Sequence, residues 1–311
     1  MKPLLLSCIV TAAVMTMVVP VAGTRQSDTG AHPHFSARSE LVVLHVTVKD
    51  RRGGYVTGLS ERAFQVFDEG RPQPIAFFTG EDAPVTVGLV VDNSGSMRQS
   101  RKRVLTAVRA FVEAGHTEDE VFALTFNERV RPVLGADAPF TSDAETLRAA
   151  LTSALIARGR TALFDAVAEG LVYLQRGRHA RQVLVVIGDG GDNASEIAFD
   201  SVLRRAQASN AAIYTVGFVD PLDTESDPKV LRRLAETTGG ESFFPEDPSR
   251  IQAVLGRIAE DIRHIYTIGY VPRAAGAPAA LHRLRVKVTP PDGRRTEVRT
   301  RTSYLAGGTR R

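Results

Sequence analysis

Three oxygen-bearing side chains at alternate positions carry the chemistry that this sequence suggests. Asp92, Ser94 and Ser96 follow an unbroken apolar run, 85–91, of the kind that forms a strand buried on both faces. In open α/β sheets, ligands bind where such strands end at their carboxyl edge. One carboxylate and two hydroxyls, without a thiol or an imidazole, suit a hard cation such as Mg²⁺, Mn²⁺ or Ca²⁺.

Two further segments are expected to bring ligands to the same edge. Thr161 opens a predicted helix after a basic, glycine-containing turn, and Asp189 ends a second apolar run, 182–188. The first motif alone also fits a turn that leads into a helix, with Asp92 or Ser94 as the N-cap. The companion residues favour a metal site, because three separate segments then converge on one cation.

This set of residues resembles the metal-ion-dependent adhesion site of von Willebrand factor type A domains. The family motif Asp-x-Ser-x-Ser matches residues 92–96, and its distant Thr and second Asp match Thr161 and Asp189. The resemblance covers residues 84–264, which we therefore interpret as one such domain. The sequence departs from the family at Gly188, where a Ser or Thr is common before the second Asp. More loosely, the flanks are similar to those of bacterial secreted proteins of this type.

The resemblance implies how a cation would be held. Ser94, Ser96 and Thr161 would bind it through their hydroxyls, while Asp92 and Asp189 would contribute charge, partly through water. Mg²⁺ is the expected ion, and Mn²⁺ or Ca²⁺ are alternatives. An open coordination position would be filled by an Asp or Glu of a partner protein, so the resemblance implies a metal-dependent adhesion module.

Other polar residues near these segments have simpler interpretations. Asp192 and Asn193 could form a second metal site, but such residues more often cap a helix or shape a loop. Asp165 is expected on a helix surface or beside a ligand. The seven histidines are dispersed and show no metal-ligand spacing.

The elements that position the site alternate between strand and helix from residue 85 to residue 263. This alternation predicts a doubly wound, mostly parallel α/β sheet flanked by helices. The segment 130–134 contains a proline and is expected to return as an antiparallel edge strand. The apolar spacing of 143–156 predicts a helix over that whole range.

The flanking segments show β patterns instead. We expect 39–80 and 265–304 to form one small β-sandwich into which the α/β domain is inserted, because neither half could bury a core alone. Two separate β extensions are the alternative. The turn 290–293, Pro-Pro-Asp-Gly, predicts a hairpin between the last two strand patterns, and 73–78 predicts one short strand.

The N-terminus has the pattern of an export signal. Lys2 precedes a continuous apolar stretch, and small residues at 21–23 suit signal-peptidase cleavage. We expect 1–23 to be a cleaved signal peptide, 24–38 a flexible linker and 305–311 a disordered tail, with a secreted, periplasmic or envelope location. An uncleaved signal would instead anchor the chain in the membrane. The single Cys8 lies within the signal, so the mature chain would have no disulfide.

Composition and motifs exclude several functions. The net charge is +4, but tryptophan is absent and aromatic residues make up only 6%, so nucleic-acid binding is not expected. No Gly-x-Ser-x-Gly elbow or phosphate-binding glycine loop is present, so we expect a binding protein and not an enzyme. A metal-dependent hydrolase or phosphatase, and a structural envelope protein with a vestigial metal site, are the alternatives.

Overall fold

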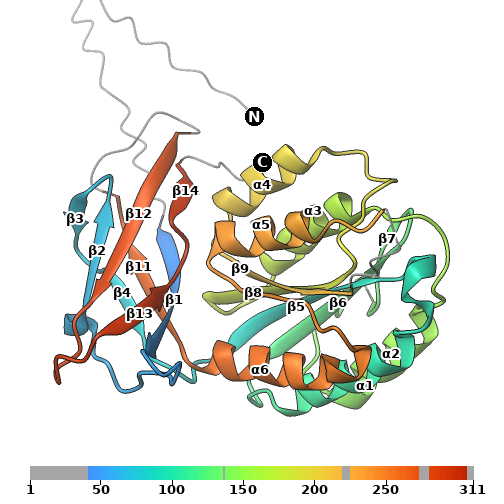
Figure 1. Ribbon diagram of the computed structural model, residues 1–311, viewed down its shortest axis with the longest axis horizontal. Helices are drawn as coiled ribbons and strands as arrows, with labels where there is room; N and C mark the ends of the chain where they lie inside the picture. Colours follow the sequence, from blue (N-terminus) through green and yellow to red (C-terminus); the bar gives the residue numbers. More distant parts are fainter. Residues whose placement is uncertain (1–40, 136, 219–224, 273–279, 307–311) are drawn as a thin grey trace, which may run out of the picture. The chain divides into compact units, whose positions relative to one another are not determined.

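The computed structural model describes residues 41–135, 137–218, 225–272 and 280–306, which belong to one compact unit (Figure 1). The predicted signal peptide, the linker 24–38 and residues 307–311 lie outside the described residues. The described part contains six α-helices: α1 (Arg101–Glu113), α2 (Ala144–Ala154), α3 (Leu163–Leu174), α4 (Phe199–Ala208), α5 (Pro228–Thr238) and α6 (Ile251–Arg263).

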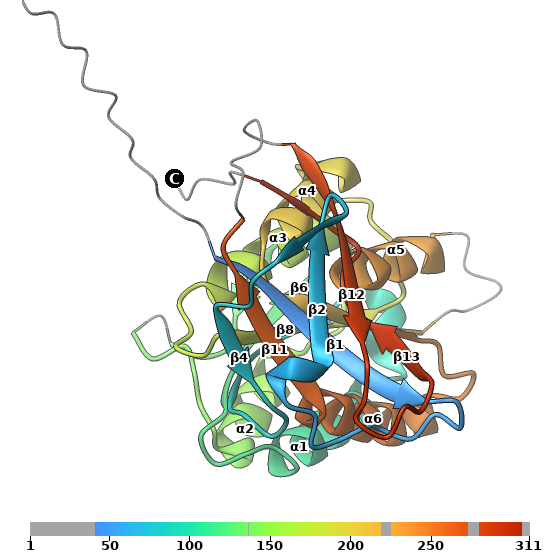
Figure 2. The same cartoon turned by 90° about the vertical axis from the view of Figure 1, so that its left-hand side faces the viewer.

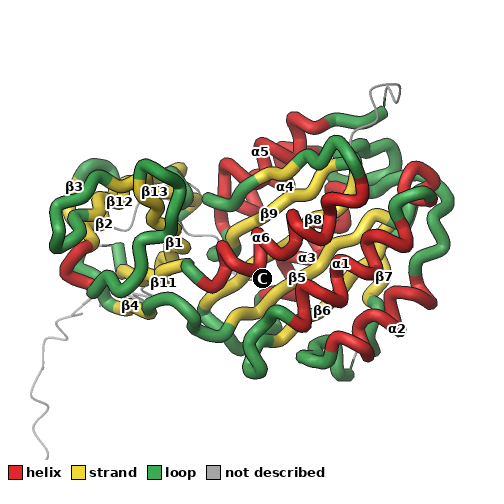
Figure 3. The backbone as a smooth tube through the Cα atoms, turned by 60° about the horizontal axis from the view of Figure 1, so that its bottom comes forward, coloured by secondary structure: helices red, strands yellow, loops and turns green. Residues whose placement is uncertain are grey.

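The central sheet has six strands in the order β10-β9-β8-β5-β6-β7. Neighbouring strands are parallel except β7, which pairs antiparallel with β6 at one edge, as the proline-containing segment predicted. Figure 3 shows the inner strands side by side. The strands are β5 (Val85–Asp92), β6 (Glu120–Phe126), β7 (Val130–Pro132), β8 (Arg181–Gly188), β9 (Ala212–Gly217) and β10 (Ser242–Phe243).

Two apolar cores cover the two faces of this sheet. Helices α1, α2 and α6 bury Val104, Leu147 and Leu255 against one face. Helices α3, α4 and α5 cover the other face (Figure 1). At Gly88 of β5 there is no room for a side chain, since a Cβ atom would lie 2.4 Å from the ring of Phe122. The predicted doubly wound α/β fold is therefore confirmed.

Two small antiparallel sheets are built from the flanking segments (Figure 2). Their strand orders are β13-β1-β11-β4 and β14-β12-β2-β3, so each sheet combines strands that precede and follow the α/β domain. The sheets share one core, to which Leu44, Val66, Ile268 and Val286 belong. The strands are β1 (Val42–Asp50), β2 (Phe64–Asp68), β3 (Arg71–Gln73), β4 (Phe77–Thr79), β11 (Ile265–Tyr270), β12 (Leu281–Val288), β13 (Thr296–Arg299) and β14 (Ser303–Leu305).

Three details differ from the sequence-based expectations. The turn at 290–293 does not join a hairpin, because β12 pairs with β2 and β14 while β13 pairs with β1 in the other sheet. The segment 73–78 is not one strand, because the chain leaves β3 at Gln73 and enters the other sheet as β4. Leu305 was expected in a disordered tail, but it ends β14 opposite Leu281.

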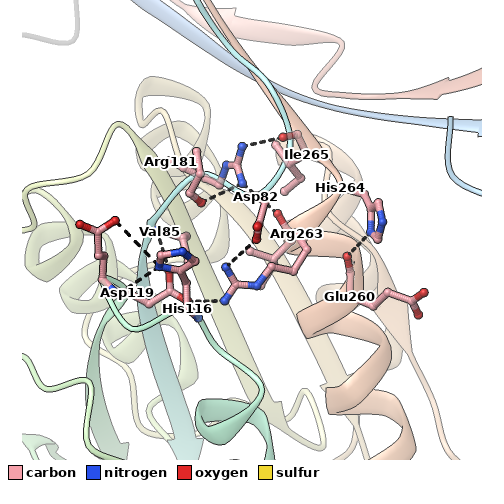
Figure 4. Close-up of polar contacts among 12 residues, drawn as sticks. Asp82, Val85, His116, Asp119, Arg181, Glu260, Arg263, His264 and Ile265 are labelled. Carbon is pink, nitrogen blue, oxygen red and sulfur yellow. Dashed lines mark hydrogen bonds and ion pairs between the residues drawn. The ribbon is translucent and has the colours of Figure 1, made fainter. Parts of the chain in front are cut away.

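Arg181 joins the α/β domain to both chain crossings that connect it with the flanking sheets (Figure 4). Its side chain is 2% exposed and donates hydrogen bonds to the carbonyls of Gly80 and Ala83, where the chain enters the α/β domain. It also donates hydrogen bonds to the carbonyls of Ile262 and Ile265, where the chain leaves the α/β domain. Buried carbonyls without a donor are destabilising, so this one guanidinium satisfies both crossings.

Replacing Arg181 with Met should lower the free energy of unfolding by about 3–5 kcal/mol, because four carbonyls lose a charged donor in a buried setting. Urea unfolding followed by circular dichroism measures this loss. Arg178→Met is the matched control and should cost less than about 0.5 kcal/mol, since the Arg178 side chain is 67% exposed. Equal stability of the two variants would contradict the assignment.

His45 of β1 makes the same region sensitive to acid. Burial, followed by the nearby charges of Arg181 and Arg301, lowers the pKa of His45 to about 3. The unfolded chain, with a pKa near 6.5, binds the proton first. Stability is therefore complete above pH 6.5 and is lost as the pH falls towards 3.

Between pH 7 and pH 4, wild type should lose about 3 kcal/mol more stability than His45→Gln, which has no proton to take up at this position. Urea unfolding of both proteins at the two pH values gives the difference directly. The same loss in both proteins would show that the imidazole is not the acid-sensitive group.

Candidate functional site

The pairing of two central strands brings two carboxylates together. Asp92 is the last residue of β5, and Asp189 directly follows β8. The strands are parallel neighbours with Val91 opposite Ile187, so both aspartates reach the carboxyl edge of the sheet, with Asp189 one residue further along than Asp92. Both side chains are buried, with 2% and 6% exposure.

Hydrogen bonds connect four of the five predicted ligands. The Ser94 and Ser96 hydroxyls lie 3.0 Å apart, and the Ser96 hydroxyl donates to Oδ2 of Asp189 over 2.7 Å. The backbone N–H of Ser94 donates to Oδ1 of Asp92, also over 2.7 Å. Among these four residues Ser96 is exposed, while Asp92, Ser94 and Asp189 are buried.

Asp92 is in an electrostatically unfavourable position. Its Oδ2 atom is buried without a hydrogen-bond partner. Burial and then the charge of Asp189 raise its pKa to about 7. Two neighbouring carboxylates and an unpartnered oxygen form a donor set that fits a divalent cation, since a cation offsets both penalties. Residue 188 is glycine at this point, and a Cβ atom there would lie 3.1 Å from Oδ2 of Asp92.

Thr161 is held beside the Asp189 loop through its backbone. Its N–H donates to Oδ1 of Asn193 over 2.9 Å, and its carbonyl accepts from the N–H groups of Asn193 and Ala194. The side chain is 8% exposed. The structure thus brings the Thr161 segment to the loop that carries Asp189, while the hydrogen bonds among the other four ligands do not include it.

The acidic residues near these loops have structural partners. Asp192 accepts from the N–H of Phe164 in the first turn of α3, and also from Ser195. Asp165 accepts from the N–H groups of Glu196 and Ile197. These contacts shape the loop after β8. Among the described residues, no three carboxylate, imidazole or thiol groups gather at one point, so any metal site here depends on the hydroxyls.

Asn93, which sequence reasoning passed over, ties the Asp92 loop to the segment before Thr161. Its Oδ1 accepts from the N–H groups of Ile156 and Ala157 over 2.7 and 2.6 Å, and its Nδ2 donates to the carbonyl of Ala154. Helix α2 therefore ends at Ala154 and does not continue to residue 156 as predicted. The sequence signal for this role of Asn93 was its position: a short amide side chain directly after the aspartate that ends the strand.

Comparison with known proteins gives one family and several similar folds. The sequence model of the von Willebrand factor type A domain family matches residues 87–257 of this chain. No functionally curated protein matches the chain. A von Willebrand factor type A protein from Catenulispora acidiphila is 13% identical with a TM-score of 0.52, and the match covers 86% of this chain and 75% of that one.

A second similar fold is proximal thread matrix protein 1 from the mussel byssus. It is 12% identical with a TM-score of 0.52, and the match covers 63% of this chain and 51% of the mussel protein. The chain thus aligns with about half of that protein. At these identities the two similarities concern the fold alone.

Asn93→Ala should lower the free energy of unfolding by about 2–4 kcal/mol, because it leaves two backbone N–H groups without an acceptor. Asn193→Ala is the control from the same site. Its cost should be about 1 kcal/mol, because it removes one hydrogen bond to a backbone N–H at a half-buried position and one exposed hydrogen bond to Glu225. Urea unfolding of both variants tests this order, and a reversed order would contradict the role given to Asn93.

Proposed function

Because the chain belongs to the von Willebrand factor type A family, we propose that it is a metal-dependent binding protein that captures an acidic residue of a partner protein. The cation would be held by Asp92, Ser94, Ser96, Thr161 and Asp189. Mg²⁺ is the proposed ion, with Mn²⁺ or Ca²⁺ as alternatives, because all five side chains offer oxygen atoms.

The observation that carries this proposal is the buried Oδ2 of Asp92 beside Asp189. Without a cation, two like charges and an unpartnered oxygen destabilise the strand ends on which they lie. The cation would supply a Lewis-acidic centre that accepts a carboxylate from outside. Ser94 and Ser96 orient their oxygens through their mutual contact, and the exposed position of Ser96 marks the side open to a partner.

A binding role fits these side chains better than catalysis. The hydroxyls of Ser94 and Ser96 contact each other and Asp189, and no imidazole takes part in these hydrogen bonds. A serine nucleophile needs an adjacent base that can accept its proton, and a carboxylate committed to a cation is a poor one. We therefore propose that the chain is not a hydrolase or phosphatase.

The proposed location is outside the cytoplasm, after cleavage of residues 1–23, with membrane attachment only if the signal is retained. This part of the proposal rests on the sequence pattern at the N-terminus. Within the described residues, no helix has the length and apolar character needed to cross a membrane.

Asp92→Asn should have opposite effects with and without metal. In EDTA at pH 8, the variant should be more stable than wild type by about 2 kcal/mol, because a buried charge next to Asp189 is removed. In Mg²⁺ at 100 times its dissociation constant, wild type should gain about 2.7 kcal/mol and the variant nothing. Thermal unfolding with and without Mg²⁺ measures both effects.

Asp192→Asn is the matched control, because its carboxylate serves the loop and the start of α3. This variant should keep the stabilisation by Mg²⁺. A full Mg²⁺ response in Asp92→Asn would overturn the metal site. A wild type that does not respond to Mg²⁺, Mn²⁺ or Ca²⁺ would instead support a vestigial site.

A further inference from the structure

We propose that the segment from Ile156 to Arg160 selects the partner, and that the partner is a protein segment with three features. One Asp or Glu reaches the metal, an apolar side chain packs on Ile156, and a further acidic residue lies against Arg158 and Arg160. This inference rests on the proposed function, because it describes what surrounds the carboxylate that the cation captures.

The segment lies at the rim of the candidate metal site, between the loop after β5 and the loop after β6. The N–H of Arg158 donates to the carbonyl of Asn93 over 2.9 Å, and the N–H of Gly95 approaches the carbonyl of Gly159 at 3.4 Å. On the other side, Nδ2 of Asn127 donates to the carbonyl of Arg158. The segment then continues directly into Thr161, so a partner bound at the metal must meet it.

Ile156 is exposed to 59%, the highest value among the large apolar side chains of the described residues. A single exposed isoleucine is ordinary. This one lies between two residues, Leu155 and Ala157, that are each only 3% exposed. It is therefore an outward-facing side chain on an otherwise buried stretch of backbone.

The backbone conformation that exposes Ile156 is locally unfavourable, and the surrounding fold maintains it. Ala157 has a φ of +56°, a left-handed conformation that costs a non-glycine residue about 1–2 kcal/mol. The Asn93 side chain maintains it by accepting from both Ile156 and Ala157. Backbone strain that is fixed by surrounding contacts is common at binding sites, where it presents a side chain in one orientation.

The charges beside Ile156 favour an acidic partner. Arg158 and Arg160 are both exposed. Glu128 is the nearby acid, and its Oε1 accepts from the backbone N–H of Arg160 over 2.9 Å. Two exposed guanidiniums against one carboxylate leave this rim positive, and complementary charge directs association.

Acidic side chains also lie beside the loop that carries Asp189. Oε2 of Glu225 accepts from Nδ2 of Asn193 on the loop that carries Asp189. Glu225 and Asp227 are both exposed there. The additional acidic residue of the partner therefore belongs beside Arg158 and Arg160.

A phage-displayed library of random peptides, panned on the full chain, tests the inference. Binding is carried out in Mg²⁺ and release in EDTA. Peptides recovered in this way should contain an Asp or Glu with an aliphatic or aromatic neighbour and a second acidic residue. Ile156→Ser should weaken a recovered peptide about tenfold, the loss expected for one buried aliphatic side chain.

The charged part is tested with Arg158→Gln/Arg160→Gln, which should weaken the peptide at low salt and reduce the dependence of its affinity on salt. The matched controls are Val172→Ser, an exposed aliphatic residue on α3, and Arg204→Gln/Arg205→Gln on α4. Both should bind like wild type. An unchanged stabilisation by Mg²⁺ in every variant shows that the metal centre is intact.

The outcomes separate this inference from the proposed function. Peptides that need Mg²⁺ and Asp92 but bind equally to Ile156→Ser and to the double arginine variant overturn the inference alone. If no peptide is retained in Mg²⁺ and released by EDTA, the site does not capture carboxylates, and both the proposed function and the inference fail.

Discussion

Two carboxylates held at the ends of adjacent parallel strands are the constraint on which this site depends. β5 and β8 are buried on both faces, so their register is set by apolar packing on both sides of the sheet. The aspartates cannot separate without moving the core. The repulsion between them is therefore built into the fold, and the nearby hydroxyls and backbone N–H groups relieve only part of it.

A second set of contacts adapts this family fold to the present chain. The amide of Asn93 joins the loop after β5 to the segment that leads to Thr161, and the backbone of that segment is strained at Ala157. The Asn93 side chain thus joins the loop of candidate ligands after β5 to the segment at its rim. Removal of the Asn93 amide is therefore expected to disturb both the loop after β5 and the segment before Thr161.

The sequence predicted those parts that depend on periodicity. Apolar runs ending in Asp92 and Asp189 indicated two buried parallel strands, and the family resemblance added the candidate ligands, whose role in metal binding stays a prediction. The sequence did not predict contacts between distant side chains. The turn 290–293 has good hairpin chemistry, yet the strand after it, β13, pairs with β1 of the other sheet, a distant partner that the local sequence does not identify. Helix α2 ends early because of Asn93, which is 61 residues from Ala154.

In the sequence, Arg181 is an ordinary charged residue next to a predicted strand. The four carbonyls that it contacts become evident only in the fold.

The path of β5 through the molecule has a mechanical consequence. The strand begins at Val85, next to the crossing held by Arg181, and ends at Asp92. A pull at Asp92 would therefore run along β5 to the flanking sheets. Parallel ladders with β6 and β8 resist such tension on both sides, and their hydrogen bonds would be loaded together in shear and not opened one after another. Tension applied at Asp92 would therefore be shared by the neighbouring strands of the sheet.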